Sequence, residues 1–233
     1  MGHTHYWELD LKAKEGVLRR LPDIALDFQR LLPHLPPLAG PDGTGNPIVS
    51  PEEIAFNGPL PHDYESLVFP GDLEEPAWRE PWERRGRSFG FCKTGPSWQE
   101  KRPYDLAVRS FLLLAKVHLG GLMRVYSDAP LADWAEAALL IEGTLALPVD
   151  LYGLLGAGLL EVEDTRGRRF LVERWGGEES ELQDWLRARE RMDREGLFPW
   201  PFRGPYRVLG EVKVPQEELP GLWRREGFYR GVS

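Results

Sequence analysis

The side chains best suited by type and spacing to do chemistry are three cations around the predicted start of a helix. Lys93 ends a predicted strand, and Lys101 and Arg102 directly precede a proline that is typical of a first helical position. Cations are disfavoured at a helix amino terminus, where the helix dipole favours anions. We therefore predict an anion site in which helix N–H groups and these cations hold a phosphate or a carboxylate. The predicted anion-binding residues are Lys93, Thr94, Lys101, Arg102, Tyr104 and Asp105.

A simpler interpretation of the same segment remains open. Asp105, at the third position of the helix, can cap it and offset the three positive charges, which are then merely solvated. The chain also lacks the short motifs of hydrolases, zinc proteases and P-loop proteins. The glycine-rich stretch 40–47 therefore reads as a turn.

Cys92 is a second candidate, because a thiol near a helix start and lysines can act as a nucleophile. Its natural base would be His118. That histidine, however, lies about 22 Å along the helix from Pro103, at 1.5 Å per residue. We therefore expect Cys92 to be a small buried hydrophobe and His118 to be a cation near the helix carboxyl terminus.

His3 and His5 point to the same face of the first predicted strand. A His-x-His pair can chelate a metal, but a site needs further ligands. His62, Asp63 and Asp42 are candidates that the sequence does not place. The expectation is two exposed terminal histidines, so no metal and no cofactor are predicted.

Trp78, Trp82 and Trp98 fall in segments that are predicted to lie at the surface. Exposed aromatic side chains beside arginines are typical of protein interfaces, so these three are the predicted partner-binding residues. Base stacking is the alternative, and the acidic composition disfavours it.

The composition limits the class of protein. The 233 residues suffice for one large domain or two small ones, and the formal net charge is −8. Such a charge argues against a non-specific binder of nucleic acid or anionic membrane. The single cysteine excludes an intrachain disulfide. No run is apolar enough for a membrane span and the first residues lack a signal-peptide pattern, so a cytoplasmic location is expected.

Hydrophobic periodicity over the first two thirds of the chain predicts alternating strands and helices. Strands are expected at 6–11, 53–57, 66–69, 88–93 and 123–127, and helices at 17–32, 103–118 and 131–145. This order is close to βαββαβ, so we predict an α+β, ferredoxin-like domain with an added helix. The polar stretch 70–87 is predicted to be a long surface excursion, either a lid or a binding arm.

A break near residue 148 predicts two domains, 1–148 and 149–233. The second is expected to be a small α+β module of hairpin, helix, strand and helix. Its predicted elements are strands at 159–163, 170–175 and 206–214 and helices at 178–195 and 216–229.

Short motifs across roughly residues 1–135 resemble a family of uncharacterised proteins found in phages, mobile elements and bacterial genomes. The motifs are His5-Tyr6, Phe56-Asn57-Gly58, Phe91-Cys92-Lys93-Thr94, Arg102-Pro103-Tyr104-Asp105, Ala115-Lys116-Val117-His118-Leu119-Gly120 and Ser127-Asp128. The chain departs from the family at 95–101, an insertion, and at Arg102, where relatives carry lysine. The resemblance implies a context without an established activity and gives weight to Cys92, Lys93, Tyr104 and Asp105.

The sequence favours a non-enzymatic protein-interaction or accessory protein whose partner is another protein, with self-association left open. The alternative is an enzyme or ligand-binding domain for a phosphorylated small molecule or nucleotide, held by Lys93, Lys101 and Arg102. DNA or RNA binding through 84–102 is a third and less favoured alternative.

Overall fold

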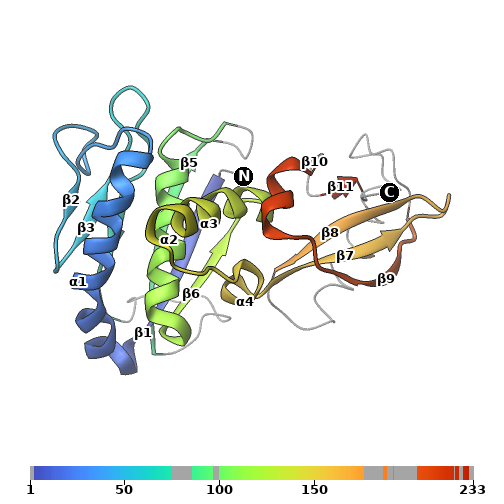
Figure 1. Cartoon of the computed structure of the whole chain (residues 1–233), viewed down its shortest axis with the longest axis horizontal. Helices are drawn as coiled ribbons and strands as arrows, with labels where there is room; N and C mark the ends of the chain where they lie inside the picture. The colour runs from blue at the N-terminus through green and yellow to red at the C-terminus, as the bar shows by residue number, and fades with distance from the viewer. Residues whose placement is uncertain are drawn as a thin grey trace. The chain divides into compact units, whose positions relative to one another are not determined.

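Strand β1 (His3–Asp10) is the centre of the amino-terminal sheet in the computed structural model of this chain (Figure 1). The structure describes residues 3–74, 86–96, 100–175, 186–187, 191, 204–222, 224–225 and 228–230. β5 (Arg87–Gly95) and β6 (Met123–Ser127) pair with β1 on either side, both antiparallel. Burial alternates along β1 from His5 onward, as the period-two pattern predicts: Trp7 and Leu9 are buried, whereas Tyr6 and Glu8 are partly exposed.

Two helices connect these strands and pack against each other (Figure 1). They are α1 (Lys14–Leu31), between β1 and β5, and α2 (Asp105–Leu119), between β5 and β6. α2 is buried almost all round and contacts β1 and β6, so it forms the core on one face of the sheet. It stops at Gly120, whose positive φ of 53° suits glycine. α1 runs through Pro22 without ending there.

The short strands β2 (Ile48–Val49), β3 (Ile54–Phe56) and β4 (Leu67–Phe69) form a separate antiparallel sheet. The α+β class is therefore confirmed. The ferredoxin-like arrangement is not, because in the described residues the amino-terminal sheet has three strands and β4 pairs with β3 instead of joining it. Residues 75–85, most of the predicted excursion, lie outside the described residues.

The chain divides into two units. Unit 1 comprises 1–129 and 133–154, and unit 2 comprises 130–132 and 155–233. The helix α3 (Leu131–Leu145) begins at the three-residue segment of unit 2 and continues in unit 1. The predicted break near residue 148 precedes α4 (Leu151–Leu155), and the chain passes from unit 1 to unit 2 between residues 154 and 155.

Unit 2 contains a five-stranded antiparallel sheet of order β10-β11-β8-β7-β9. Its strands are β7 (Ala157–Glu163), β8 (Arg169–Trp175), β9 (Arg207–Val212), β10 (Arg224–Arg225) and β11 (Phe228–Arg230). The predicted helix at 216–229 is wrong: a 3-10 helix, Gln216–Gly221, precedes the last two strands. Pro220 and Gly221 explain the difference, because both oppose continuation of an α-helix. Of the predicted helix at 178–195 the structure describes 186–187 and 191, which are helical.

In the segments that the structure describes, no helix combines the length and the apolar composition needed to cross a bilayer.

Candidate metal centre

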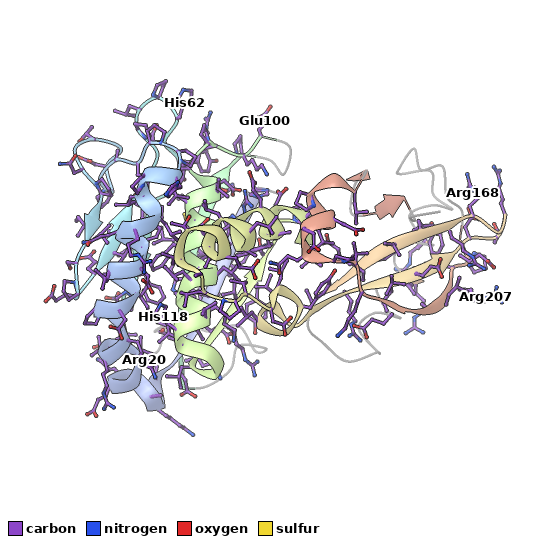
Figure 2. The ribbon with its side chains drawn as sticks, viewed as in Figure 1. Arg20, His62, Glu100, His118, Arg168 and Arg207 are labelled. Atoms are coloured by element: carbon purple, nitrogen blue, oxygen red, sulfur yellow. The ribbon has the colours of Figure 1, made fainter. Side chains whose placement is uncertain are left out.

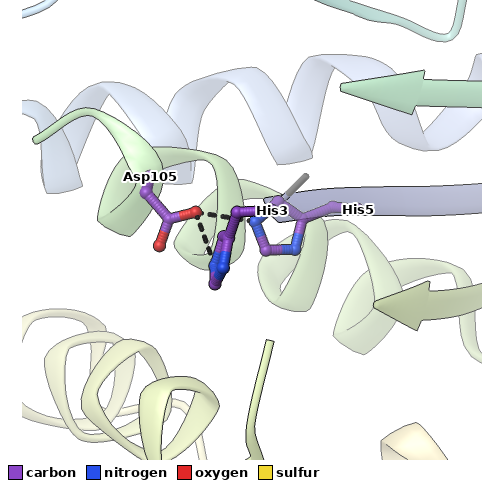
Figure 3. A group of neighbouring side chains, drawn as sticks. All are labelled: His3, His5 and Asp105. Carbon is purple, nitrogen blue, oxygen red and sulfur yellow. Dashed lines mark hydrogen bonds and ion pairs between the residues drawn. The ribbon is translucent and has the colours of Figure 1, made fainter. Parts of the chain in front are cut away.

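Three side chains that are distant in the sequence meet between β1 and the start of α2 (Figure 3). His3 and His5 come from β1, and Asp105 is the first residue of α2. One nitrogen of each ring and one carboxylate oxygen all lie within 4.8 Å of one another. The three side chains are 1%, 0% and 1% exposed, so the group belongs to the protein interior.

Local structure explains why these residues converge. Period two along β1 directs His3 and His5 to the face that α2 covers. Two backbone hydrogen bonds of Arg102 fix the connection between β5 and α2. The N–H of Arg102 donates to the carbonyl of Thr94 (2.8 Å), and the carbonyl of Arg102 accepts from the N–H of Asp105 (3.0 Å). The carboxylate of Asp105 is thereby held opposite the two rings.

Hydrogen bonds orient His5 and the carboxylate. Nε2 of His5 lies 2.8 Å from Oδ1 of Asp105, and Nδ1 lies 2.8 Å from Oγ of Ser127. The hydroxyl of Thr94 donates to the same Oδ1 at 2.5 Å. The ring of Trp134 meets the ring of His5 edge-on, with centroids 5.6 Å apart. Both His5 and Asp105 are therefore held in one orientation.

Arg109 forms an ion pair with the second carboxylate oxygen of Asp105, Oδ2. Its Nε donates to Oδ2 of Asp105 at 2.7 Å, and both side chains are 1% exposed. The guanidinium also donates to the backbone carbonyl of Asp133 and lies 3.3 Å from a carboxylate oxygen of Glu136. The charge of Arg109 is thus shared between two carboxylates, and Oδ1 is left facing the histidines.

Among the residues that the structure describes, His3 lacks the hydrogen bonds that orient His5 and Asp105. Its Nε2 lies 3.2 Å from Oδ1 of Asp105, but out of line for a hydrogen bond. Within the described residues both of its ring nitrogens are buried and have no hydrogen-bond partner. Buried polar atoms are nearly always satisfied, and each exception calls for an explanation such as a bound ion.

The charge states follow from burial and these contacts. Burial lowers the pKa of His5 below its usual value of 6.5, against the opposing effect of Asp105. Burial acts to raise the pKa of Asp105, but the contacts with His3 and His5 and the charge of Arg109 outweigh it and hold that pKa well below the usual range. The site thus contains a neutral imidazole at His5 and an ionised carboxylate.

The predicted anion-binding residues do not form one group in the structure. Nζ of Lys101 pairs with the carboxylate of Asp133 at 2.7 Å, and Nζ of Lys93 lies 5.5 Å from the centre of the Tyr64 ring. The hydroxyl of Tyr104 donates to the carbonyl of Glu65 at 2.7 Å. Thr94 and Asp105 do meet, but in the histidine group, where Asp105 accepts from side chains and does not act as a cap. Nε of Arg102 is buried and, among the described residues, lacks a hydrogen-bond partner, so anion binding there stays a prediction.

Cys92 is a buried thiol. Its Sγ donates to the carbonyl of Glu65 at 3.3 Å, and burial raises its pKa far above the usual value. A thiol of this kind is a poor nucleophile. The proposed base, His118, pairs with Asp27 at 3.1 Å.

The other predicted candidates lie elsewhere. Figure 2 shows His62 and His118 toward opposite ends of unit 1. Asp42 accepts hydrogen bonds from Thr44 within its own turn, and His62 is exposed while Asp63 is half-buried. The predicted partner-binding residues Trp78, Trp82 and Trp98 lie outside the described residues.

The expectation of two exposed terminal histidines is wrong, because β1 is the central strand and buries both. His5, Thr94, Asp105 and Ser127, which meet here, all belong to the motifs that carry the family resemblance. Sequence reasoning missed the convergence of these motifs. It also missed Arg109, for which the one available signal was a cation within an apolar helix.

Comparisons with protein-family models, with curated proteins and with solved structures each gave no match. The resemblance to phage and mobile-element proteins therefore stays a prediction. The geometry of the site is the basis on which a function can be assigned.

Proposed function

We propose that unit 1 is a metal-binding domain in which His3, His5 and Asp105 hold one divalent first-row transition metal ion. The observation that carries the proposal is the buried ring of His3, whose Nε2 lies 3.2 Å from Oδ1 of Asp105 and, among the described residues, has no hydrogen-bond partner. An ion placed between the three side chains would bind this nitrogen directly and neutralise the charge of the Asp105 carboxylate beside it. Among the described residues, no other three His, Cys, Asp or Glu side chains are grouped in this way.

The ligand chemistry supports this class of ion. Two imidazole nitrogens and one carboxylate oxygen form the protein ligand set of many zinc and non-haem iron sites. Such ligands are usually fixed by further hydrogen bonds, which set the ring tautomer and the carboxylate orientation. Ser127 fills that role for His5, and Thr94 and Arg109 fill it for Asp105.

The position of the site favours a stabilising role for the ion. It would join the first strand of the chain to the start of α2, and all three ligands are nearly inaccessible. Because an ion that binds the folded state alone stabilises that state, metal binding and folding of unit 1 would be coupled.

The test is a zinc titration of the full chain in competition with a chromophoric chelator. The wild type is expected to bind one Zn²⁺ per chain. His3→Gln and His5→Gln are expected to lose affinity by about 100-fold or more, and Ser127→Ala, which removes an outer hydrogen bond, by about 10- to 100-fold. His62→Gln, an exposed histidine, is the matched control and is expected to bind as the wild type does. A wild type without affinity for Zn²⁺, Co²⁺ or Fe²⁺, or equal affinity in His3→Gln, would refute the proposal.

For this unit we also retain the ferredoxin-like arrangement as a proposal. It is supported by the central position of β1 between β5 and β6 and by the two helices that connect them.

A further inference from the structure

The face of the amino-terminal sheet opposite the candidate metal centre carries a group of aromatic side chains. Phe89 and Phe91 of β5 are 41% and 53% exposed, and Tyr126 of β6 is 42% exposed. Tyr6 of β1 lies between them and is half-buried. Large exposed apolar groups gathered on one face are typical of an interaction site. We call these four residues the aromatic face.

The strand register brings the four rings together. Tyr6 is the partner of Phe91 on one side and of Tyr126 on the other, so one row of aromatic residues crosses all three strands. Phe89 lies in the next row, opposite Glu8. Ring centroids are 6.0 Å apart for Tyr6 and Phe89 and 6.3 Å apart for Phe89 and Phe91, with interplanar angles of 31° and 34°. The rings of Tyr6, Phe89 and Phe91 are thus neighbours and are moderately tilted against one another.

Gly90 explains why this face carries the rings. Its position between Phe89 and Phe91 belongs to the opposite side of the sheet, where the indole of Trp7 packs directly on its backbone. Trp7 is 2% exposed, so its indole packs between the strand and the core on the buried side of the sheet. The two phenylalanines are consequently held on the open side of a rigid strand.

Positive charges border the aromatic face. Lys93 follows Phe91 on the same side of β5, Arg124 faces Glu8 across β1 and β6, and Arg87 precedes Phe89. Arg87 pairs with two carboxylates on this side of β1, Glu8 at 3.8 Å and Asp10 at 4.0 Å, so Lys93 and Arg124 are the cations that the border offers to a ligand. Lys93 and Arg124 are half-buried, and Nζ of Lys93 lies 5.5 Å from the centre of the Tyr64 ring. A local cationic border is compatible with the net charge of −8 of the whole chain.

We infer that the aromatic face binds single-stranded RNA, with unpaired bases stacked on Phe89, Phe91 and Tyr6 and phosphates held by Lys93 and Arg124. One class of RNA-binding domain presents aromatic rings on a four-stranded sheet and stacks two or three bases on them. The amino-terminal sheet offers a similar row of rings on the three strands that the structure describes. The segment from Arg87 to Phe91 also matches four of the first five positions of the sequence pattern found on such sheets, with Ser88 where the pattern has glycine. The inference is independent of the metal centre, since the two sites use opposite faces of β1.

The test is fluorescence anisotropy of labelled 12-nucleotide oligo(rU) and oligo(rA) with the full chain. The wild type is expected to bind, and Phe91→Ala and Phe89→Ala are each expected to weaken binding by about 5- to 150-fold. Phe91→Tyr keeps the aromatic ring and is expected to retain the RNA affinity. Phe91→Leu keeps only the apolar character of the side chain, and its RNA affinity is expected to fall. Leu26→Ala, which removes an exposed apolar side chain from α1, is the control and is expected to bind as the wild type does.

Salt dependence supplies a second readout. Lys93→Ala and Arg124→Ala are each expected to reduce the slope of log affinity against log salt by about 0.7, the value for one phosphate contact on a single strand. Three results would overturn the inference: no binding of either RNA, binding confined to oligo(dT) or to duplex, and RNA binding that Phe89→Ala and Phe91→Ala leave unchanged. Circular dichroism of each variant verifies that the fold is retained.

Discussion

His5 Nε2 and Asp105 Oδ1 lie 2.8 Å apart in the interior of unit 1, although 100 residues separate them in the sequence. This contact joins the first strand to the start of the central helix. Because Asp105 also holds Arg109 and receives the hydroxyl of Thr94, the carboxylate is the common point of a buried polar network. The proposed metal site adds an ion to a network whose geometry the fold already defines.

Removal of the Asp105 carboxylate is expected to destabilise the fold strongly. Asp105→Ala leaves the guanidinium of Arg109 buried without its main partner, and we expect the free energy of unfolding to fall by about 3–5 kcal/mol. The measurement is urea denaturation with a metal chelator present, so that the ion pair is tested apart from the metal. Asp133→Ala breaks the more exposed pair with Lys101 and should cost about 0–1 kcal/mol. Equal losses in the two variants would contradict the importance of the buried pair.

Gly90 is expected to tolerate no side chain. A Cβ at this position would lie 2.2 Å from Cε2 of Trp7, and the buried indole has little room to move. Gly90→Ala should therefore lower the free energy of unfolding by about 1–3 kcal/mol. For Gly121 no described atom lies within 4 Å of such a Cβ, so Gly121→Ala is the control and should change stability by less than about 0.5 kcal/mol. A Gly90→Ala variant as stable as the control would show that Trp7 does not pack as described.

Asn57 is expected to require its amide. Its Oδ1 accepts from the N–H groups of Gly58 and Tyr64, while Nδ2 lies 3.3 Å from acceptors on Pro41, Tyr64 and Ser66. Asn57→Asp places a carboxylate against those acceptors and should cost at least about 1–3 kcal/mol at neutral pH. The exposed Asn46 supplies the control: Asn46→Asp should leave the urea midpoint nearly unchanged. If both variants unfold at the wild-type midpoint, the amide contacts of Asn57 contribute nothing.

The thiol of Cys92 is expected to be protected. Reaction with a disulfide reagent at pH 8 should be at least about 100-fold slower in the native chain than in urea, which corresponds to an opening free energy of about 2.8 kcal/mol. Burial raises its pKa in the folded state, so the unfolded chain ionises first as the pH rises. The resulting stabilisation is complete below the ordinary pKa of about 8.5 and is lost as the pH rises above it. Rapid native labelling would contradict the buried position.

Much of unit 1 could be predicted from local patterns. Alternation at Tyr6 and Trp7 identified β1 and its two faces, and the apolar character of α2 identified the central helix. These features depend on residues close together in the sequence, where periodicity is informative. At the other end of the chain the sequence predicts a helix over 216–229, while Pro220 and Gly221 end the short 3-10 helix that forms there.

The candidate site could not be predicted from local sequence patterns, because its residues are distant in the sequence. The sequence points to Asp105 together with the cations beside it, and not together with His3 and His5. That pairing depends on β1 lying between β5 and β6, which no local pattern specifies. The motif residues were the right ones in part: His5, Thr94, Asp105 and Ser127 meet in one network once the strands are paired.

The most direct test of the metal proposal is X-ray absorption spectroscopy of the zinc-loaded chain after gel filtration in a weak chelator. We expect one Zn²⁺ per chain with two imidazole ligands at about 2.0–2.1 Å and oxygen in the remaining positions. In His3→Gln the imidazole contribution should fall to one, and in His62→Gln it should be unchanged. Zinc that is lost during gel filtration, or a wild-type first shell without imidazole, would contradict the account.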